Sequence, residues 1–303
     1  MDQIAPHRAG SFAEFAAGAG KMFVPDDIAA GMAAYKPRPT DVIITPYGKC
    51  GTTWLQQIFH TLRSRGDFDF DDISRVVPWI ETSKIVGLDI EAPQRAEPRG
   101  FKSHLGYDQV PKGARYIVSF RHPHDACVSF YHFMEGWFFE PGAVSLEEFV
   151  GMYCMRTGLE TDYWHHLVSW WAQRDNPNVL ALAYEQMNAD PAGTVRKVAA
   201  FTGIPLDDEL LALTLERSSF AFMLAHKDRF DDLLMRQASE VRCNLPAGSD
   251  SAKVRKGGSG QGKAELTPEL MAQLDAQWTR IVTPATGFAD YAALEAEMRR
   301  RSA

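Results

Sequence analysis

The stretch Asp41–Leu55, DVIITPYGKCGTTWL, decides the fold. Its first part, Asp41–Thr45, is a β-branched run of strand length that ends at Pro46. After a short glycine-containing loop, apolar residues recur at helical spacing through residues 55–62. The stretch therefore predicts a strand, a loop and a helix. The first turn of such a helix offers unpaired N–H groups and a partial positive charge, which favour the binding of an anion.

The loop itself differs from the P-loop of nucleoside-triphosphate enzymes, G-x-x-x-x-G-K-[ST]. Ile43 stands where the first glycine belongs, and Cys50 stands where a hydroxyl would hold magnesium. Lys49 still supplies a charge, Gly51 allows a close backbone approach, and Thr52–Thr53 add hydroxyl donors. We expect a loop for a nucleotide whose transferable group needs no metal. The alternative is an ordinary glycine turn with a solvated lysine.

The rest of the chain repeats the alternation of short strands and helices. Tyr116–Phe120 and Val179–Tyr184 have strand patterns, and each is followed by a helical segment. Asp190 and Pro191 form a helix start, and Gly203 marks its end. This order predicts an α/β class, with a single domain and a mostly parallel sheet flanked by helices. Ligands of such sheets bind beyond the carboxyl ends of the strands.

Composition limits the possible functions. The 303 residues include 45% hydrophobic and 23% charged side chains, which suffice for a sizeable core. A net charge of −7 argues against a nucleic-acid partner. The four cysteines are spaced unlike a disulfide framework or a zinc site. No apolar run approaches the ~20 residues that span a membrane, and no secretory signal is visible, so a cytoplasmic location is expected.

We expect two parts along the chain. Residues 1–40 are rich in Ala, Gly and Pro and predict an irregular, partly helical lead-in. Residues 41–303 form the single α/β domain.

The segment 38–55, RPTDVIITPYGKCGTTWL, resembles the 5′-phosphosulfate-binding loop of the cytosolic sulfotransferases, whose usual form is close to Y-P-K-S-G-T-T-W-L. That family binds 3′-phosphoadenosine 5′-phosphosulfate (PAPS). The resemblance implies that the cofactor contacts Lys49, Cys50, Gly51, Thr52, Thr53 and Trp54. Two residues depart from the family pattern: Gly48 replaces proline and Cys50 replaces serine.

The segment 116–133, YIVSFRHPHDACVSFYHF, resembles the 3′-phosphate segment of the family, R-N-P-x-D-x-x-x-S-x-Y-H-F. The resemblance implies that Arg121 and Ser129 bind this phosphate. A guanidinium fits two phosphate oxygens at once. Because Arg121 follows a strand, as Lys49 does, both could share one site. His122 stands in place of the usual asparagine.

Residues 255–263, RKGGSGQGK, resemble the family element R-K-G-x-x-G-x-x-K. The resemblance implies that Arg255, Lys256 and Gly257 bind the cofactor and that residues 250–263 close over it. Taken alone, this basic Gly/Ser run is typical of a flexible linker.

Two further matches fall at the adenine end. Tyr184 in LALAYEQM matches L-x-Y-E-D-M, and Ser218 and Phe220 match a T-S-F element. The resemblance implies that these residues line the adenine, whereas the pattern alone is equally typical of core residues.

Residues 101–105, FKSHL, match the family's K-T-H-L, which carries the catalytic base. The acceptor must lose a proton as its oxygen attacks sulfur, and a histidine can take that proton near neutral pH. The resemblance implies in-line transfer with His104 as base, Lys49 at the leaving oxygen and Lys102 at the sulfonate. The product is adenosine 3′,5′-bisphosphate (PAP). No metal is expected, because the nearby histidines lack ligand spacing.

Acceptor pockets of the family are apolar, so we expect a small lipophilic acceptor with a hydroxyl, either a phenol or an alcohol. Five aromatic residues are candidate wall residues: Trp79, Tyr107, Phe133, Trp137 and Phe138. The family's dimer motif, K-x-x-x-T-V-x-x-x-E, is not recognisable near Lys263. Instead, Thr267–Pro268 starts a helix.

Three alternatives remain open at this point. A metal-dependent nucleotide kinase shares the strand–loop–helix order. A non-catalytic nucleotide-binding protein would share the cofactor site. An enzyme that uses sulfonation as a step towards elimination would share the chemistry and differ only in its product.

Overall fold

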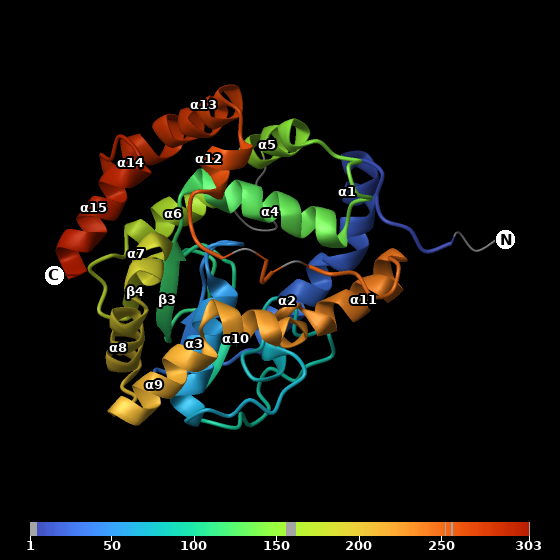
Figure 1. Cartoon of the computed structure of the whole chain (residues 1–303). Helices are drawn as coiled ribbons and strands as arrows, with labels where there is room; N and C mark the ends of the chain where they lie inside the picture. Colours follow the sequence, from blue (N-terminus) through green and yellow to red (C-terminus); the bar gives the residue numbers. More distant parts are fainter. Residues whose placement is uncertain (1–4, 156–161, 252, 256, 303) are drawn as a thin grey trace.

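One parallel sheet lies at the centre of the molecule (Figure 1). The computed structural model describes residues 5–155, 162–251, 253–255 and 257–302. The strand order is β2-β1-β3-β4, and every neighbouring pair is parallel. The strands are β1 (Val42–Ile44), β2 (Gly100–Lys102), β3 (Arg115–Phe120) and β4 (Val179–Ala183). The predicted α/β class with a single, parallel-sheet domain is confirmed.

Side chains alternate between the two faces of the sheet, as the strand period of two requires. On one face, Val42 and Ile44 pack with Ile117 in one core. On the other, Ile43 packs with Tyr116 and Val118 in a second core. Because both faces are buried, these strands are continuously apolar rather than alternating in polarity.

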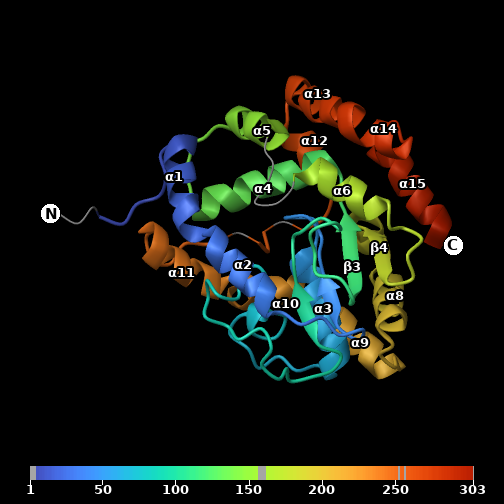
Figure 2. The same ribbon diagram turned by 180° about the vertical axis from the view of Figure 1, so that it is seen from behind.

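Helices cover both faces. The first face carries α3 (Thr52–Ser64), α8 (Pro191–Thr202) and α9 (Asp208–Arg217), which pack on one another. The second face carries α4 (Pro123–Trp137) and α6 (Tyr163–Trp171). The C-terminal helices α13 (Pro268–Gln277), α14 (Thr283–Thr286) and α15 (Tyr291–Ser302) run along the outer margin of the molecule in both views (Figures 1 and 2).

The helix boundaries follow local capping chemistry. The Asp190 carboxylate accepts a hydrogen bond from Gly193 N at 2.8 Å at the start of α8. Gly203 ends α8 in the left-handed conformation, with φ of 74°. Thr267 caps α13 in the same way as Asp190 caps α8. All three boundaries agree with the sequence predictions.

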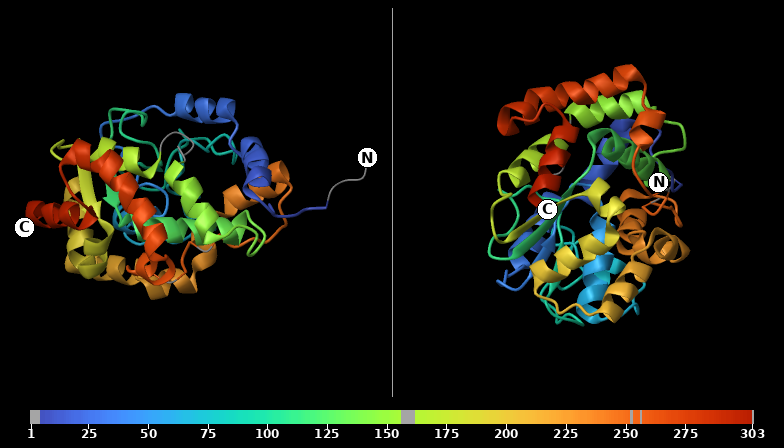
Figure 3. Two further views of the ribbon diagram at one scale, coloured as in Figure 1. Left: turned by 90° about the horizontal axis from the view of Figure 1, so that it is seen from above. Right: turned by 60° about the vertical axis from the view of Figure 1, so that its left-hand side comes forward.

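Helices within residues 5–40 pack against the sheet-containing part of the molecule. They are α1 (Phe12–Met22) and α2 (Pro25–Ala34). α1 lies beside α11 (Leu233–Cys243), as Figure 3 shows from above. The rings of Phe12 and Phe15 both lie 5.2 Å from the ring of Phe139, between centroids. This segment therefore contributes to the second core.

The remaining elements are short. They are α5 (Leu146–Met155), α7 (Tyr184–Ala189), α10 (Phe220–Ala225), α12 (Gln261–Glu265), the 3₁₀ turns Ile73–Arg75 and Lys227–Phe230, and a π-helical turn Trp278–Val282.

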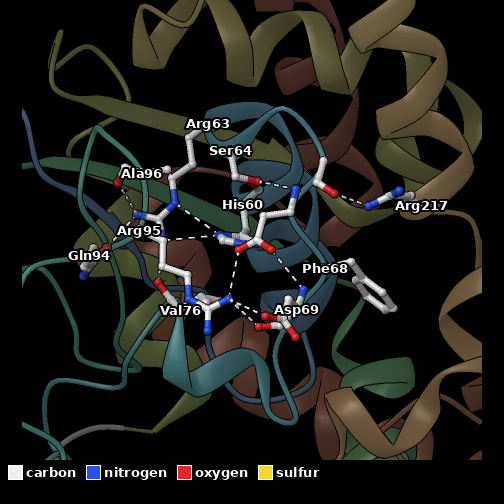
Figure 4. A network of polar contacts seen from close by, with 12 residues as sticks. His60, Arg63, Ser64, Phe68, Asp69, Val76, Gln94, Arg95, Ala96 and Arg217 are labelled. Carbon is white, nitrogen blue, oxygen red and sulfur yellow. Dashed lines mark hydrogen bonds and ion pairs between the residues drawn. The ribbon is translucent and has the colours of Figure 1, made fainter.

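A buried polar network holds the long segment between α3 and β2 (Figure 4). The guanidinium of Arg63 donates to Gln94 Oε1 at 2.6 Å, to Pro98 O at 3.0 Å and to Val76 O at 2.5 Å. Its Nε donates to Nδ1 of His60 at 3.3 Å. Burial lowers the pKa of Arg63 to about 10, so the group still carries its charge at neutral pH. The side chain of Arg63 thus anchors a segment that contains little regular secondary structure.

Replacing Arg63 with methionine is expected to lower the free energy of unfolding by about 3 kcal/mol, because several buried acceptors lose their donor. Urea unfolding measures the change. Arg65→Met is the matched control, since Arg65 pairs with Asp207 on the surface and its loss should leave the midpoint nearly unchanged. Equal midpoints for the two variants would contradict the anchoring role of Arg63.

Candidate active site

A cavity of about 800 Å³ lies at the carboxyl ends of the strands. Lys49 follows β1, His104 follows β2, Arg121 follows β3 and Tyr184 follows β4, and all four line this cavity. Such convergence is what a parallel sheet produces, because its carboxyl ends meet along one edge. The residues expected at one site are thus brought together by the sheet.

The loop after β1 bends through left-handed backbone. Lys49 has φ of 68° and Gly51 has φ of 100°. A Cβ on Gly51 would lie 3.0 Å from the ring of Tyr184, so both conformation and space favour glycine here. Thr52, Thr53 and Trp54 follow on the first turn of α3 and line the cavity.

Two polar atoms of this turn are buried without a hydrogen-bond partner among the described residues: Thr52 Oγ1 and Trp54 Nε1. Buried polar groups are normally paired, so these atoms are available for a ligand.

Cys50 differs from its predicted role as a cofactor contact. Its side chain is packed in the second core and does not line the cavity. Burial raises the pKa of the Cys50 thiol to about 12, so the thiol stays protonated. The Cys50 carbonyl accepts a hydrogen bond from Ser119 Oγ at 2.5 Å. The Cys50 side chain is thus turned away from the cavity, and its backbone N donates to Tyr47 O at 3.1 Å.

Arg121 joins three parts of the site. Its guanidinium lies 4.4 Å from the centroid of the Tyr184 ring. Nη1 donates to Lys49 O at 2.9 Å, and Nη2 donates to Gly258 O at 3.3 Å. Its Nε is buried and has no partner within the described part of the chain. Ser129, on α4, also lines the cavity. This arrangement fits a phosphate.

Residues from 253–255 and 257–261 line the cavity. Arg255 donates to Gln261 Oε1 at 2.8 Å, and both side chains line the cavity. Gly257 has φ of 64°, and a Cβ there would lie 2.8 Å from the Phe220 ring. Lys256, also expected at the cofactor, lies outside the described residues.

Asp125 on α4 fixes the far end of this segment. Its two carboxylate oxygens accept hydrogen bonds from Gly260 N and Gly262 N, both at 2.7 Å. The segment therefore approaches α4 through glycine backbone.

The adenine end expected from the sequence is also at the cavity. Tyr184, Ser218 and Phe220 line it. Phe220 is 43% exposed, an unusual exposure for a large apolar ring. Trp54 packs edge-on against Tyr184 with centroids 5.9 Å apart. Two aromatic rings and an exposed phenylalanine provide a surface on which a base can stack.

His104 lies beside Trp79 with its ring held in one orientation. Nδ1 lies 2.7 Å from Pro46 O, and since a carbonyl only accepts, Nδ1 carries the proton and Nε2 is free to accept one. Its backbone N donates to Glu81 Oε1 at 2.9 Å. Burial and the nearby Lys102 lower the pKa of His104 well below 6.5. The imidazole is therefore neutral at pH 7, as a base must be.

The two lysines of the predicted site are strongly desolvated. Lys49 Nζ lies 4.6 Å from the Phe133 ring centroid, and Lys102 Nζ lies 4.1 Å from that of Trp79. Burial lowers the pKa of Lys49 to about 7 and that of Lys102 to about 8. An anion placed between them would raise both values. The desolvation of these two lysines therefore favours the binding of a negatively charged ligand.

Aromatic and aliphatic side chains form the other half of the cavity. Trp79, Phe133, Trp137 and Phe138 line it as the sequence predicted. Tyr107 does not line it, because its ring packs against the Trp170 ring of α6 with centroids 5.3 Å apart. Several other lining residues were not predicted from the sequence: Phe15, Ala19, Phe23, Phe130, Met134 and Met235.

Two charged residues at the cavity were also missed, Asp232 and Lys253. They lie outside the motifs, although Lys253 stands two residues before Arg255.

The described residues bear on metal binding and on membrane crossing. No group of three or more His, Cys, Asp or Glu side chains there is arranged to hold a metal ion. None of the helices in that part of the chain has the length and apolar character needed to cross a membrane.

The chain matches known proteins over most of its length. Residues 39–282 match the family model described as the sulfotransferase domain. Human sulfotransferase 2A1 is 32% identical over 238 residues, which cover 76% of this chain and 80% of the relative. Luciferin sulfotransferase of Photinus pyralis is 27% identical, with 81% and 72% coverage.

Solved structures share the fold. Retinol dehydratase in complex with androsterone and the inactive cofactor PAP superimposes with a TM-score of 0.68 at 21% identity, covering 85% of this chain and 84% of that one. Mouse sulfotransferase SULT7A1 complexed with PAP gives 0.65 at 21% identity, with 86% and 90% coverage. The matched domain and the fold agree, and the chain belongs to the sulfotransferase domain family as a PAPS-dependent enzyme.

Proposed function

We propose that this sulfotransferase acts on the hydroxyl of an apolar alcohol or phenol, with His104 as the base. The observation that supports this most is the shared cavity, which joins the anion-binding loop, a neutral histidine and an aromatic wall. PAPS supplies the sulfuryl group. The residues divide accordingly into a nucleotide end, a transfer centre and an acceptor end.

At the nucleotide end, we assign the 5′-phosphosulfate to Lys49 and the backbone of residues 50–53. We assign the 3′-phosphate to Arg121, Ser129 and Arg255. The unpaired Nε of Arg121 supports this assignment, since a phosphate oxygen would satisfy it. Tyr184, Ser218 and Phe220 then line the adenine, and residues 250–263 close over the cofactor.

At the transfer centre, His104 Nε2 receives the acceptor's proton as the new S–O bond forms. Lys49 stabilises the charge that develops on the leaving phosphate oxygen, and Lys102 stabilises the sulfonate. The hydrogen bond from Nδ1 to Pro46 O holds the imidazole in the tautomer that this step requires.

At the acceptor end, the aromatic wall supports an acceptor of some length. Phe15 and Phe23 from the N-terminal segment and Phe138, just after α4, add three rings to this wall. Relatives include a retinol dehydratase crystallised with androsterone and with retinol, both bulky apolar molecules. Sterol-like and polyene alcohols are therefore the first acceptors to test.

The test is a transfer assay with PAPS and three acceptors: 2-naphthol, androsterone and retinol. We expect a sulfate ester and one PAP per ester, in EDTA, with a lower KM for the longer acceptors. Mass spectrometry separates the ester from a dehydrated product, which would instead indicate elimination. Absence of both products with every acceptor, while PAP still binds, would contradict the proposal and favour a non-catalytic binding protein.

The desolvated lysines predict a pH dependence of cofactor binding. In the free protein the pKa of Lys49 is about 7 and that of Lys102 about 8, against an ordinary 10.5. An anion binds the protonated forms, so binding takes up protons as pH rises through these values. We expect the affinity for PAPS to fall about tenfold or more between pH 7 and 9. Calorimetry in two buffers of different ionisation enthalpy measures both effects; a flat profile without proton uptake would contradict the assignment.

A further inference from the structure

Asp232 and Lys253 form a buried ion pair at the transfer centre. The Asp232 carboxylate pairs with Lys253 Nζ and lies 3.9 Å from Lys102 Nζ. The side chains of Asp232, Lys102 and Lys253 are 4%, 3% and 9% exposed. All three line the cavity. One carboxylate thus bridges two ammonium groups beside the residues assigned to sulfuryl transfer.

The backbone directs Asp232 toward this pair. Asp232 stands at the N-cap position of α11, where an aspartate normally accepts a backbone N–H. Its side chain makes no such bond, and its backbone is left-handed, with φ of 49°. Instead Asp72 Oδ2 accepts the hydrogen bond from Leu234 N at 2.9 Å. Because Asp72 takes over capping, the carboxylate of Asp232 is left for the lysines.

The charges around the Asp232–Lys253 ion pair favour the binding of an anion. Lys49, Lys102 and Lys253 share one carboxylate, so the group carries two net positive charges when all three lysines are protonated. The other charged or titratable groups that face it are Arg121, His104, Glu81, Asp72 and Asp231. Like charges in a buried site are unfavourable without a counterion. The 5′-phosphosulfate of PAPS carries two negative charges, one on its phosphate and one on its sulfonate, which balance the three lysines and the carboxylate.

We propose that Lys253 is a third lysine at the sulfonate of PAPS and that Asp232 is a positioning residue that holds Lys253 and Lys102 beside each other. This rests on the proposed function, since it assigns a further role within the same site. Although burial raises it, attraction from Lys102 and Lys253 lowers the pKa of Asp232 to about 2, so the carboxylate stays ionised. Its charge in turn opposes the loss of a proton from Lys102 and Lys49.

The first test compares the affinities of PAPS and PAP, which differ by the sulfonate. Lys253→Met should weaken PAPS about tenfold or more while changing PAP much less, because a charge-assisted contact to the sulfonate is lost. Lys253→Arg should restore most of the difference. Lys227→Met is the matched control, because Lys227 pairs with Asp250 at 2.8 Å on the surface.

The second test uses Asp232→Asn. Without the carboxylate, Lys102 and Lys49 should lose their protons at lower pH. The fall of PAPS affinity with rising pH should therefore shift to lower pH by about one unit. Asp175→Asn is the control, since Asp175 is an exposed aspartate that pairs with Arg174 at 3.8 Å. Thermal melts report whether each variant is folded, and Lys253→Met alone decides the proposal if Asp232→Asn does not fold.

The outcomes separate the two proposals. An unchanged ratio of PAPS to PAP affinity in Lys253→Met, or equal losses for both ligands, would overturn the role of Lys253. An unshifted pH profile in folded Asp232→Asn would overturn the positioning role. If wild type forms sulfate esters while these results are negative, only this inference fails. If wild type binds both nucleotides but forms no ester, the proposed function fails instead.

Discussion

Replacing His104 with asparagine is expected to reduce kcat for sulfuryl transfer by about 10²–10⁴-fold, the usual contribution of a general base. Asparagine can still donate to Pro46 O, which the Nδ1 of His104 contacts at 2.7 Å, so the local fold is retained. The side chain loses only the nitrogen that accepts the acceptor's proton. The affinity for PAP should stay within about threefold, because His104 lies at the transfer centre and not among the phosphate contacts.

Steady-state kinetics with 2-naphthol and calorimetry with PAP measure the two effects. His165→Asn is the control, since His165 is a largely exposed residue that pairs with Asp162 at 2.7 Å. The acid side of the pH–rate profile should also disappear in the His104 variant. If transfer survived at the wild-type rate, another group would have to be the base.

Replacing Lys49 with methionine is expected to lower kcat by about 10²–10³-fold, the loss seen when one donor to a developing negative charge is removed. Methionine keeps much of the apolar stem that packs near the Phe133 ring, 4.6 Å from Nζ. The affinity for PAP should fall as well, because Lys49 is assigned to the 5′-phosphate.

The pH dependence distinguishes this explanation from a folding defect. Burial lowers the pKa of Lys49 to about 7, so proton uptake on PAP binding near pH 7.5 should shrink in the variant. Lys112→Met serves as the control, since Lys112 is an exposed lysine that donates to Val110 O at 2.9 Å. Proton uptake equal to that of wild type would show that another group titrates, and the assignment of Lys49 would be wrong.

Local chemistry explains what the sequence predicted well. The start of α8 at Asp190 and its end at Gly203 depend on residues next to each other in the chain, and both are as expected. The position of Lys49 and Arg121 at one edge follows from the parallel sheet alone. Such features need no knowledge of distant contacts.

Side-chain direction explains the differences. Whether residue 50 faces a ligand depends on the left-handed turn at Lys49, and that turn buries the Cys50 thiol. Tyr107 lies in the same loop as His104, yet its ring packs on the Trp170 ring. Sequence spacing gives the position of a residue along a loop but not the side to which it points.

Long-range packing explains what was missed. Phe15 reaches the cavity because α1 packs beside α11, more than two hundred residues later. Asp232 and Lys102 meet although more than a hundred residues separate them, and Asp72, which accepts from Leu234 N beside Asp232, comes from a third part of the chain. Only the folded structure brings these segments together.

The structure also bears on the kinase alternative. The position after Lys49, where a kinase would need a magnesium-binding hydroxyl, holds a thiol packed in the core. Metal-free binding of the nucleotide therefore distinguishes a sulfotransferase from a magnesium-dependent kinase.

Calorimetric titration of PAP, in EDTA, into wild type and Arg121→Ala tests the central assignment most directly. The Arg121 guanidinium bridges the loop at Lys49 and the segment at Gly258, so its loss should weaken PAP about 10- to 150-fold. Arg115→Ala, at the opposite end of β3, should bind as wild type does. We predict one metal-free PAP site per chain that depends on Arg121. Equal affinities in wild type and Arg121→Ala, or binding only with magnesium, would contradict the account.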